Sequence, residues 1–354
     1  MTHDLDKWAT WREIHAQPAI WRDWAGQVDV VELRAWVAGL GPREVWFCGA
    51  GSSSYIGDIL AAGLQGLGAF RSVPTTEIVS RPHAFLRGST PLVVQFGRSG
   101  DSAETIGLLD ALDALAPHAP RLNITCNSHG ALATRKGKGE GRTVVLPPEA
   151  HDAGFAMTSS VSTMLMTAAA IFTPDGTTPF APLADALDKA LPQFRALADQ
   201  TVAPERIVFL GTGPLAFAAR EAALKVMELA AGQISPLWES ILGFRHGPKS
   251  FVLPGTHIVL FSSQNDHAAH YEADLVVELG DQFPDCLLTV IGADQFNPGA
   301  IASDLWSAPV CLAFAQVLAV VWSDRLGLNV DNPFAGRGTL TRVVSGVKLY
   351  PVNP

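Results

Sequence analysis

Two short stretches in the first third of the chain combine glycine with hydroxyl side chains. Residues 97–105 read Gly-Arg-Ser-Gly-Asp-Ser-Ala-Glu-Thr, and residues 49–54 read Gly-Ala-Gly-Ser-Ser-Ser. Each stretch follows an apolar run and precedes a helical pattern, which directs unpaired backbone N–H groups and the positive end of a helix dipole toward the turn. Glycine permits close approach, and hydroxyls donate to phosphate oxygens. The expected phosphate ligands are Ser53, Gly97, Arg98, Ser99, Ser102 and Thr105.

A simpler interpretation of the second loop is structural: Asp101 or Ser102 caps the following helix, and the glycines close a turn. Two hydroxyl-rich loops at equivalent places favour phosphate binding over capping alone. Arg98 either neutralises a bound phosphate or points outward, and Asp101 opposes phosphate binding unless its side chain turns away. A dinucleotide site is disfavoured because Ser54 stands where the third glycine of Gly-x-Gly-x-x-Gly belongs.

A second set of chemically capable residues lies further along the chain. Glu221, Lys225 and Glu228 follow one another at i, i+4 and i+7, so they share one face of a helix. Glu228 has apolar neighbours in the sequence, and an apolar surrounding raises the pKa of a carboxyl group toward values that suit proton transfer. The same spacing also fits a solvated Glu–Lys stripe, which composition alone favours.

His246 precedes Gly247 and Pro248, a pair that predicts a turn fixing the imidazole at a loop. Lone histidines are more often structural or simply exposed. An imidazole with an ordinary pKa near 6.5 suits acid–base transfer.

Composition limits the class of protein. The chain has 354 residues, 48% of them apolar and 17% charged, which is enough for two packed domains. A net charge of −9 argues against a nucleic-acid or membrane partner. The four cysteines are widely spaced and form no Cys-x-x-Cys pair, which favours buried thiols in a reducing compartment over disulfides or a zinc site. Residues 161–172, an apolar stretch, are too short to span a bilayer, and the N-terminus lacks a signal-peptide core. We expect a cytoplasmic protein.

Strand-like runs alternate with helical patterns from about residue 43, and the order recurs from residue 205. Gly49 and Gly211 occupy equivalent places, which indicates an internal duplication. Alternation of this kind predicts an α/β fold with two doubly wound parallel sheets, each flanked by helices. We expect an N-terminal helical segment (1–44), a first domain (45–198) and a second domain (199–354). Residues 262–266 replace the phosphate loop in the second copy, so one phosphate site per chain is expected.

The two glycine loops together resemble the sugar isomerase (SIS) domain, which binds phosphosugars. Further stretches sharpen the resemblance: residues 73–79, 124–127, 151–160, 219–229, 243–250 and 341–347. In their order and residue identities these stretches resemble the bacterial galactosamine-6-phosphate deaminase/isomerase family, formerly described as tagatose-6-phosphate ketose/aldose isomerases. The isomerase half of glucosamine-6-phosphate synthase is a more distant relative.

The resemblance implies roles for particular residues. Glu228 matches the base that moves the proton, Lys225 matches a lysine of that site, and His246 matches a histidine that opens the sugar ring. In the synthase this histidine comes from the neighbouring subunit, which implies a homodimer or larger homo-oligomer with shared sites. The sugar contacts are expected from Ser52, Phe155 and Arg342. Arg342 stands where the synthase has a lysine, and Lys348 lies nearby without matching it. His151 and Asp152 alternatively cap the next helix.

The expected reaction converts galactosamine 6-phosphate to tagatose 6-phosphate and ammonia, with no metal or organic cofactor. Two alternatives stay open at this point. One is an aldose–ketose isomerase or deglycase acting on another hexose or hexosamine 6-phosphate. The other is a phosphosugar sensor without catalysis, which is disfavoured because no helix-turn-helix or basic segment adjoins the two domains.

Overall fold

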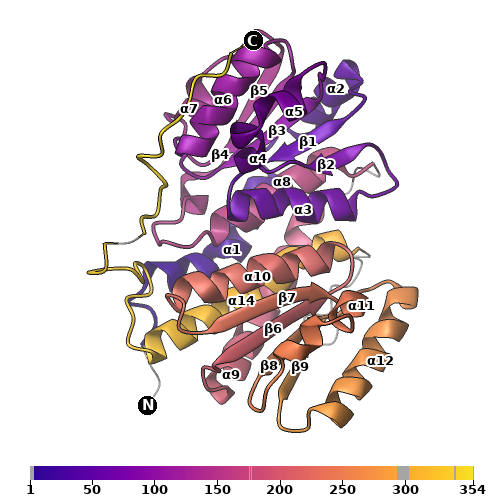
Figure 1. Ribbon diagram of the computed structural model, residues 1–354, viewed down its shortest axis with the longest axis vertical. Helices are drawn as coiled ribbons and strands as arrows, with labels where there is room; N and C mark the ends of the chain where they lie inside the picture. The colour runs from indigo at the N-terminus through magenta and orange to yellow at the C-terminus, as the bar shows by residue number, and fades with distance from the viewer. Residues whose placement is uncertain (1–3, 175, 177, 293–302, 339, 354) are drawn as a thin grey trace. The chain divides into compact units, whose positions relative to one another are not determined.

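The computed structural model describes residues 4–174, 176, 178–292, 303–338 and 340–353, and they pack into two compact units (Figure 1). Unit 1 contains the described parts of residues 1–22, 152–158 and 179–340. Unit 2 contains residues 23–151, the described parts of 159–178 and the C-terminal tail from residue 341. Each unit therefore draws on several stretches of the chain, whereas the predicted domains were continuous. The boundaries at residues 44/45 and 198/199 stay a prediction about the sequence.

Unit 2 is built on a five-stranded parallel sheet in the order β2-β1-β3-β4-β5. The strands are β1 (Val45–Cys48), β2 (Phe70–Ser72), β3 (Leu92–Gly97), β4 (Arg121–Thr125) and β5 (Gly141–Val145). Strands β1, β3 and β4 are buried at every residue, as central strands of a covered parallel sheet are. The strand order reverses between β1 and β3, which makes a switch point at their carboxyl ends.

The helices of unit 2 cover both faces of this sheet. They are α2 (Val30–Leu40), α3 (Ser52–Gly63), α4 (Thr75–Ser80), α5 (Pro82–Leu86), α6 (Ala103–Leu115), α7 (Ala131–Thr134), the 3-10 turn η1 (Pro148–Ala150) and α8 (Ser159–Phe172). On one face, Trp46 and Val93 pack with Leu108 and Leu112 of α6. On the other face, the ring of Phe47 meets that of Phe172 at 5.3 Å between centroids.

Unit 1 has a four-stranded parallel sheet in the order β7-β6-β8-β9, so the strand order is again reversed beside its first strand. Its strands are β6 (Arg206–Gly211), β7 (Ser235–Ser240), β8 (His257–Phe261) and β9 (Leu287–Ile291). Its helices are α1 (Ala9–Ala25), whose last turn belongs to unit 2, α9 (Phe180–Gln200), α10 (Pro214–Leu229), α11 (Ile241–Phe244), the 3-10 turn η2 (Pro248–Phe251), α12 (Asp266–Gln282) and α14 (Asp304–Arg325). The prediction of two parallel sheets flanked by helices is confirmed.

Helix α14 is buried along nearly its whole length. It packs against α9 and α10. Among the described residues it is also the one helix long and apolar enough to cross a membrane, but the whole apolar window is buried inside the fold. A core helix of a folded domain passes the same test, so α14 carries no argument for a membrane. The apolar stretch of residues 161–172 lies in the shorter helix α8, and the longer helix α14 was not predicted.

The turn from the first strand into the following helix is built in the same way in both units. Gly51 and Gly213 start α3 and α10 with φ values of +58° and +56°, a region that disfavours side chains. A Cβ on Gly49 would lie 2.4 Å from the backbone of Ser53, and one on Gly211 would lie 2.5 Å from that of Leu215. Glycine is required at these turns because strand end and helix start are in contact.

All four cysteines are free thiols, as expected, but they are not equally buried. Cys48, Cys126 and Cys311 are buried, whereas Cys286 is partly exposed. Burial raises the pKa of the Cys48 and Cys311 thiols, which keeps them protonated and unreactive.

Candidate active site

In unit 2, the two glycine loops lie at the switch point of the sheet. Strands β1 and β3 are neighbours in register, with Cys48 opposite Gln95, so the loops that follow them emerge at the same edge. Ligands of open parallel sheets bind at this position. The hydroxyl side chains of Ser52, Ser53 and Ser54 begin α3 there and are each 5% exposed.

Ser102 is the N-cap of α6. Its Oγ accepts the backbone N–H of Thr105 at 3.3 Å and lies 3.0 Å from Thr105 Oγ1. The capping interpretation is thus correct for Ser102. Gly100 has a φ of +71°, which turns the chain from β3 into the cap.

Asp101 faces away from the start of α6. Its carboxylate accepts the backbone N–H of Ala131 at 2.7 Å and the side-chain amide of Asn127 at 3.3 Å. The same amide donates to the carbonyl of Ser99 at 2.9 Å. Asp101 therefore holds the 127–131 loop. Because its side chain is turned away from the start of α6, it does not oppose phosphate binding there.

The Arg98 side chain points inward, although the sequence left open whether it points outward. It is 7% exposed, and its guanidinium donates to the carbonyl oxygen of Arg342 at 3.2 Å. A buried guanidinium at the end of β3 supplies positive charge at the switch point.

The C-terminal tail runs along α6 in unit 2 (Figure 1). The carbonyl of Val344 accepts the N–H of Ala103, the first residue of the helix, at 3.3 Å, and Val352 packs against the core. This arrangement brings Arg342 to Arg98. Lys348 instead lies over the ring of Tyr350, 4.8 Å from its centroid.

In unit 1, helix α10 carries a buried lysine between two carboxylates. Lys225 Nζ lies 2.6 Å from Glu228 Oε2 and 3.4 Å from Glu221 Oε1. The side chains of Lys225 and Glu221 are fully buried, and that of Glu228 is 23% exposed. The solvated-stripe interpretation is therefore wrong: this face of α10 is turned into the fold, and only Glu228 reaches solvent.

The environment of Glu228 also differs from the apolar one inferred from its sequence neighbours. Met227 is 46% exposed, because adjacent residues of a helix point about 100° apart. The contact nearest to the Glu228 carboxylate is the Lys225 ammonium. Glu228 is thus a paired carboxylate near the C-terminal end of α10.

His246 lies on the short loop between α11 and η2, and it is exposed. Its backbone N–H donates to the carbonyl of Gly243 at 2.9 Å, and the next residue, Gly247, has a φ of +115°. The predicted turn is present, and it presents the imidazole at the surface of unit 1.

Residues 152–158 join unit 1 through a set of contacts that the sequence did not reveal. Glu13 Oε1 accepts the backbone N–H groups of Ala153 at 2.6 Å and Gly154 at 3.4 Å. The backbone N–H of Phe155 donates to the carbonyl of Asp331 at 2.9 Å. The Phe155 ring lies 5.2 Å from that of Phe334. The segment that contains Phe155 is therefore held from both sides.

Two further carboxylates complete this cluster. Asp331 accepts the backbone N–H groups of Ala9 and Thr10 at 2.9 and 2.8 Å, which caps the start of α1. Asp152 is fully buried and accepts the N–H and hydroxyl of Thr158 at 2.9 and 2.7 Å. These contacts reach the residue directly before α8, and capping of α8 itself stays a prediction. Glu13 and Asp331 were missed because their partners are far away in the sequence.

Among the described residues, no group of three or more His, Cys, Asp or Glu side chains is placed to hold a metal ion. The groups that could bind a ligand or transfer a proton lie in both units. In unit 2 they are the two hydroxyl-rich loops, Arg98 and Arg342. In unit 1 they are Lys225 with Glu228, His246 and residues 152–158.

No family model matches the chain. It is 35% identical over 356 residues to a protein of Shewanella sp. (strain ANA-3) named D-galactosamine-6-phosphate deaminase AgaS, with 97% of this chain and 92% of that protein covered. It is similar to the crystal structure of tagatose-6-phosphate ketose/aldose isomerase from Escherichia coli, with 32% identity, a TM-score of 0.86 and coverage of 97% and 96%.

The C-terminal domain of glucosamine-fructose-6-phosphate aminotransferase from Francisella tularensis shares the fold, at 18% identity and a TM-score of 0.71. This match covers 94% of the present chain and 99% of the Francisella tularensis domain. The chain has parallel sheets with glycine loops at their switch points, and the proteins named above match it along nearly its whole length. These two observations define the sugar isomerase class. Within it, the chain belongs to the family of proteins named D-galactosamine-6-phosphate deaminase AgaS.

The Glu13 carboxyl provides a first test of this description. Burial, and then the charges of Asp152 and Asp331, raise its pKa to about 7, although the N–H groups of Ala153 and Gly154 oppose the shift. Between pH 4.5 and 7 the folded protein therefore binds more protons than the unfolded chain, and stability falls as pH rises through this range. Relative to Glu13→Gln, the wild type should lose about 1–2 kcal/mol of unfolding free energy between pH 5 and 8.

Urea denaturation at several pH values measures this difference. Glu205→Gln, a change at an exposed carboxylate of the same unit, is the control and should follow the wild type. Parallel pH profiles for Glu13→Gln and the wild type would contradict a Glu13 proton that is held by the fold.

Proposed function

We propose that the protein converts galactosamine 6-phosphate and water to tagatose 6-phosphate and ammonia. The observation that carries the proposal is the partly exposed carboxylate of Glu228, held 2.6 Å from the buried ammonium of Lys225. A carboxylate fixed in this way is suited to move a proton between adjacent carbons. The substrate is proposed from the names of relatives that match nearly the whole chain.

The phosphate would be bound by the loops of unit 2. The hydroxyls of Ser53, Ser99 and Thr105 can donate to its oxygens, the backbone at Gly97 leaves room, and Arg98 supplies the opposite charge. Ser102 and Thr105 share one hydroxyl–hydroxyl hydrogen bond, so one of these two hydroxyls donates to the other and the second one would donate to the phosphate. For the sugar itself we propose Ser52, the backbone at Phe155 and the cation of Arg342.

The proton transfer would use the groups of α10. With the ring open, Glu228 removes the proton from C2, a C1=C2 double bond forms, and the C1 carbonyl oxygen takes up a proton from water, which gives an enolamine. Returning the proton to C1 gives a ketimine at C2. Water adds to this ketimine and ammonia leaves, which gives the ketose. Lys225 would keep the carboxylate in place through the cycle, because Glu221 holds the ammonium from its other side.

His246 would open the ring by moving a proton between the anomeric hydroxyl and the ring oxygen. We propose that it serves the site of a neighbouring subunit, since its loop is exposed and the imidazole lies at the surface of unit 1. The working protein would then be a homodimer or a larger homo-oligomer. Four free cysteines agree with a cytoplasmic location, which cell fractionation can test.

A second candidate function is aldose–ketose isomerisation without loss of ammonia. It is favoured by the name of the Escherichia coli structure, tagatose-6-phosphate ketose/aldose isomerase. The same carboxylate would move the same proton on a substrate with a hydroxyl at C2. Ammonia release across a panel of hexosamine 6-phosphates separates the two, because only deamination produces it.

Ser99 tests the phosphate site without disturbing the helix cap. Removal of its hydroxyl should raise the KM for galactosamine 6-phosphate about 10-fold or more, since a charge-assisted hydrogen bond is worth about 1.5–3 kcal/mol. Steady-state ammonia release measures this. Ser128→Ala, at an exposed loop hydroxyl in unit 2, should leave KM unchanged. An unaltered KM in Ser99→Ala would remove this loop from the site.

Glu228→Gln keeps the shape of the side chain but removes the base. Turnover should fall about 10²–10⁴-fold while phosphosugar binding is nearly retained. Met227→Gln, at the exposed neighbouring position of the same helix, is the matched control and should keep full turnover. Full turnover in Glu228→Gln would show that the carboxylate is only a structural partner of Lys225.

Mixed oligomers test whether His246 acts on a neighbouring subunit. Glu228→Gln and His246→Ala chains should each be nearly inactive alone. After subunit exchange, hybrid dimers would contain one intact site, and activity should recover to about a quarter of the wild-type value. Exchange is verified by native mass spectrometry. Verified hybrids without recovered activity would show that each chain uses its own histidine.

A further inference from the structure

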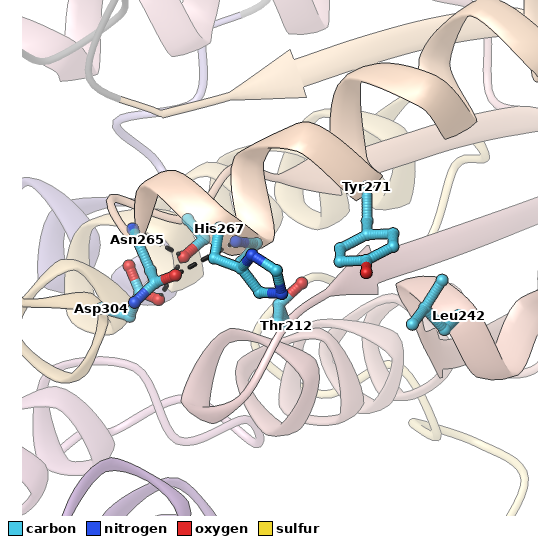
Figure 2. A pocket seen from close by; sticks show the side chains of 8 residues that line it. Thr212, Leu242, Asn265, His267, Tyr271 and Asp304 are labelled. Carbon is cyan, nitrogen blue, oxygen red and sulfur yellow. Dashed lines mark hydrogen bonds between the residues drawn. The ribbon is translucent and has the colours of Figure 1, made fainter.

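A pocket of about 550 Å³ lies at the switch point of the sheet in unit 1, away from the groups of α10 used above. Its polar lining comes from Thr212 after β6, Ser263 and Asn265 after β8, His267 and Tyr271 of α12, and Asp304 at the start of α14. Figure 2 shows Asn265 and Asp304 at one end, His267 and Thr212 between, and Tyr271 and Leu242 at the other end. Open parallel sheets bind ligands at this place.

The charge here is the opposite of that at the switch point in unit 2. Asp304 accepts the hydroxyl of Ser263 at 2.5 Å and the backbone N–H of Gln264 at 2.7 Å. Glu272, which is 3% exposed, accepts the hydroxyl of Thr212 at 2.8 Å and the backbone N–H of Ser263 at 2.9 Å. Two carboxylates thus bind the donors that would otherwise face a phosphate. The pocket is unsuited to an anion.

On the wall formed by Thr212, Ser263 and Asp304, the remaining hydrogen-bonding capacity is that of acceptors, whereas the amide of Asn265, whose Oδ1 accepts the N–H of Ala268, and the hydroxyl of Tyr271 can donate. Thr212 and Ser263 each donate their single hydroxyl proton to a carboxylate, so their oxygens can only accept further hydrogen bonds. Asp304 likewise has further lone pairs. A ligand must donate to this wall, which hydroxyl groups and an ammonium group do, and hydroxyl groups can also accept from Asn265 and Tyr271.

The far end of the pocket is less polar and includes an aromatic ring. Tyr271 is 41% exposed, and its ring packs edge-on against that of His267 with centroids 5.3 Å apart. Leu242, 48% exposed, lies beside Tyr271 at this end (Figure 2). An aromatic face attracts a cation or the apolar face of a small ring compound.

We propose that this pocket binds a small primary ammonium compound that carries hydroxyl groups and no phosphate, the chemistry of a free hexosamine. The carboxylate of Asp304 would pair with the ammonium, and the oxygens of Thr212 and Ser263 would accept from the hydroxyls. The site is separate from the proposed catalytic groups, and the inference does not depend on the reaction that they perform.

D-Galactosamine hydrochloride is the probe, and ligand-observed saturation-transfer NMR with the full-length protein is the measurement. A ligand of this size should bind with a Kd on the order of millimolar. D-Galactose, which lacks the ammonium, should bind about 10-fold more weakly or worse. Asp304→Asn should weaken galactosamine binding by about the same factor.

Two alanines of α12 provide a matched pair that leaves every hydrogen bond in place. Ala268 lines the pocket and Ala269 does not, so Ala268→Leu should fill the space and abolish binding, whereas Ala269→Leu should leave it unchanged. This pair keeps the test decisive even if Asp304→Asn fails to fold.

Excess galactosamine 6-phosphate, added to the Glu228→Gln variant so that it is not turned over, fills the proposed phosphosugar site, and galactosamine should still bind to the pocket of unit 1. The proposal is overturned by absence of saturable binding, by equal affinity for galactose, or by binding that persists in Ala268→Leu. Loss of galactosamine binding in the presence of excess galactosamine 6-phosphate would show that galactosamine enters only the phosphosugar site. None of these outcomes would alter the prediction for Glu228→Gln.

Discussion

The ammonium of Lys225, buried between Glu221 and Glu228, is the interaction on which the proposed chemistry depends. Charges removed from water are stable only when they are paired, and loss of one partner from a buried pair costs about 3–5 kcal/mol. The packing of unit 1 supplies the necessary enclosure: α10 contacts α14, β6 and β7, and Ser323 of α14 donates to the carbonyl of Leu229 at 2.6 Å. The end of α10 is therefore fixed, and with it the Glu228 carboxylate.

The two sheets show how one architecture presents opposite charges. In each, a glycine turn with positive φ brings the first helix against its strand and opens a switch point. In unit 2 this place holds serines and the buried Arg98, whereas in unit 1 it holds Asp304 and Glu272. The difference comes from the side chains placed there, since strand order and turn geometry are shared: the serines and Arg98 follow β1 and β3, whereas Glu272 lies on α12 and Asp304 begins α14. These side chains, more than the fold, set which ligand each unit can bind.

The alternation of strands and helices was predictable because apolar runs and glycine turns are local signals. The same holds for the helix cap at Ser102. Burial of the Glu221–Lys225–Glu228 face was not predictable, because a spacing of four residues is identical for a solvated stripe and a buried one. The inward direction of Arg98 and the turn of Asp101 toward Ala131 depend on tertiary contacts. Glu13 lies 140 residues from its partner Ala153, and no local sequence pattern predicts such a contact.

The central claim is that a carboxylate moves a proton between C2 and C1, and the fate of hydrogen tests it most directly. Galactosamine 6-phosphate would be turned over in D₂O, with product and recovered substrate examined by NMR and mass spectrometry. Proton transfer through a partly exposed Glu228 predicts solvent deuterium at C1 of tagatose 6-phosphate, with equimolar ammonia. It also predicts that Glu228→Gln lowers the rate of deuterium entry as much as the turnover. A product that carries no solvent deuterium at C1, with the C2 hydrogen transferred intact, would contradict it.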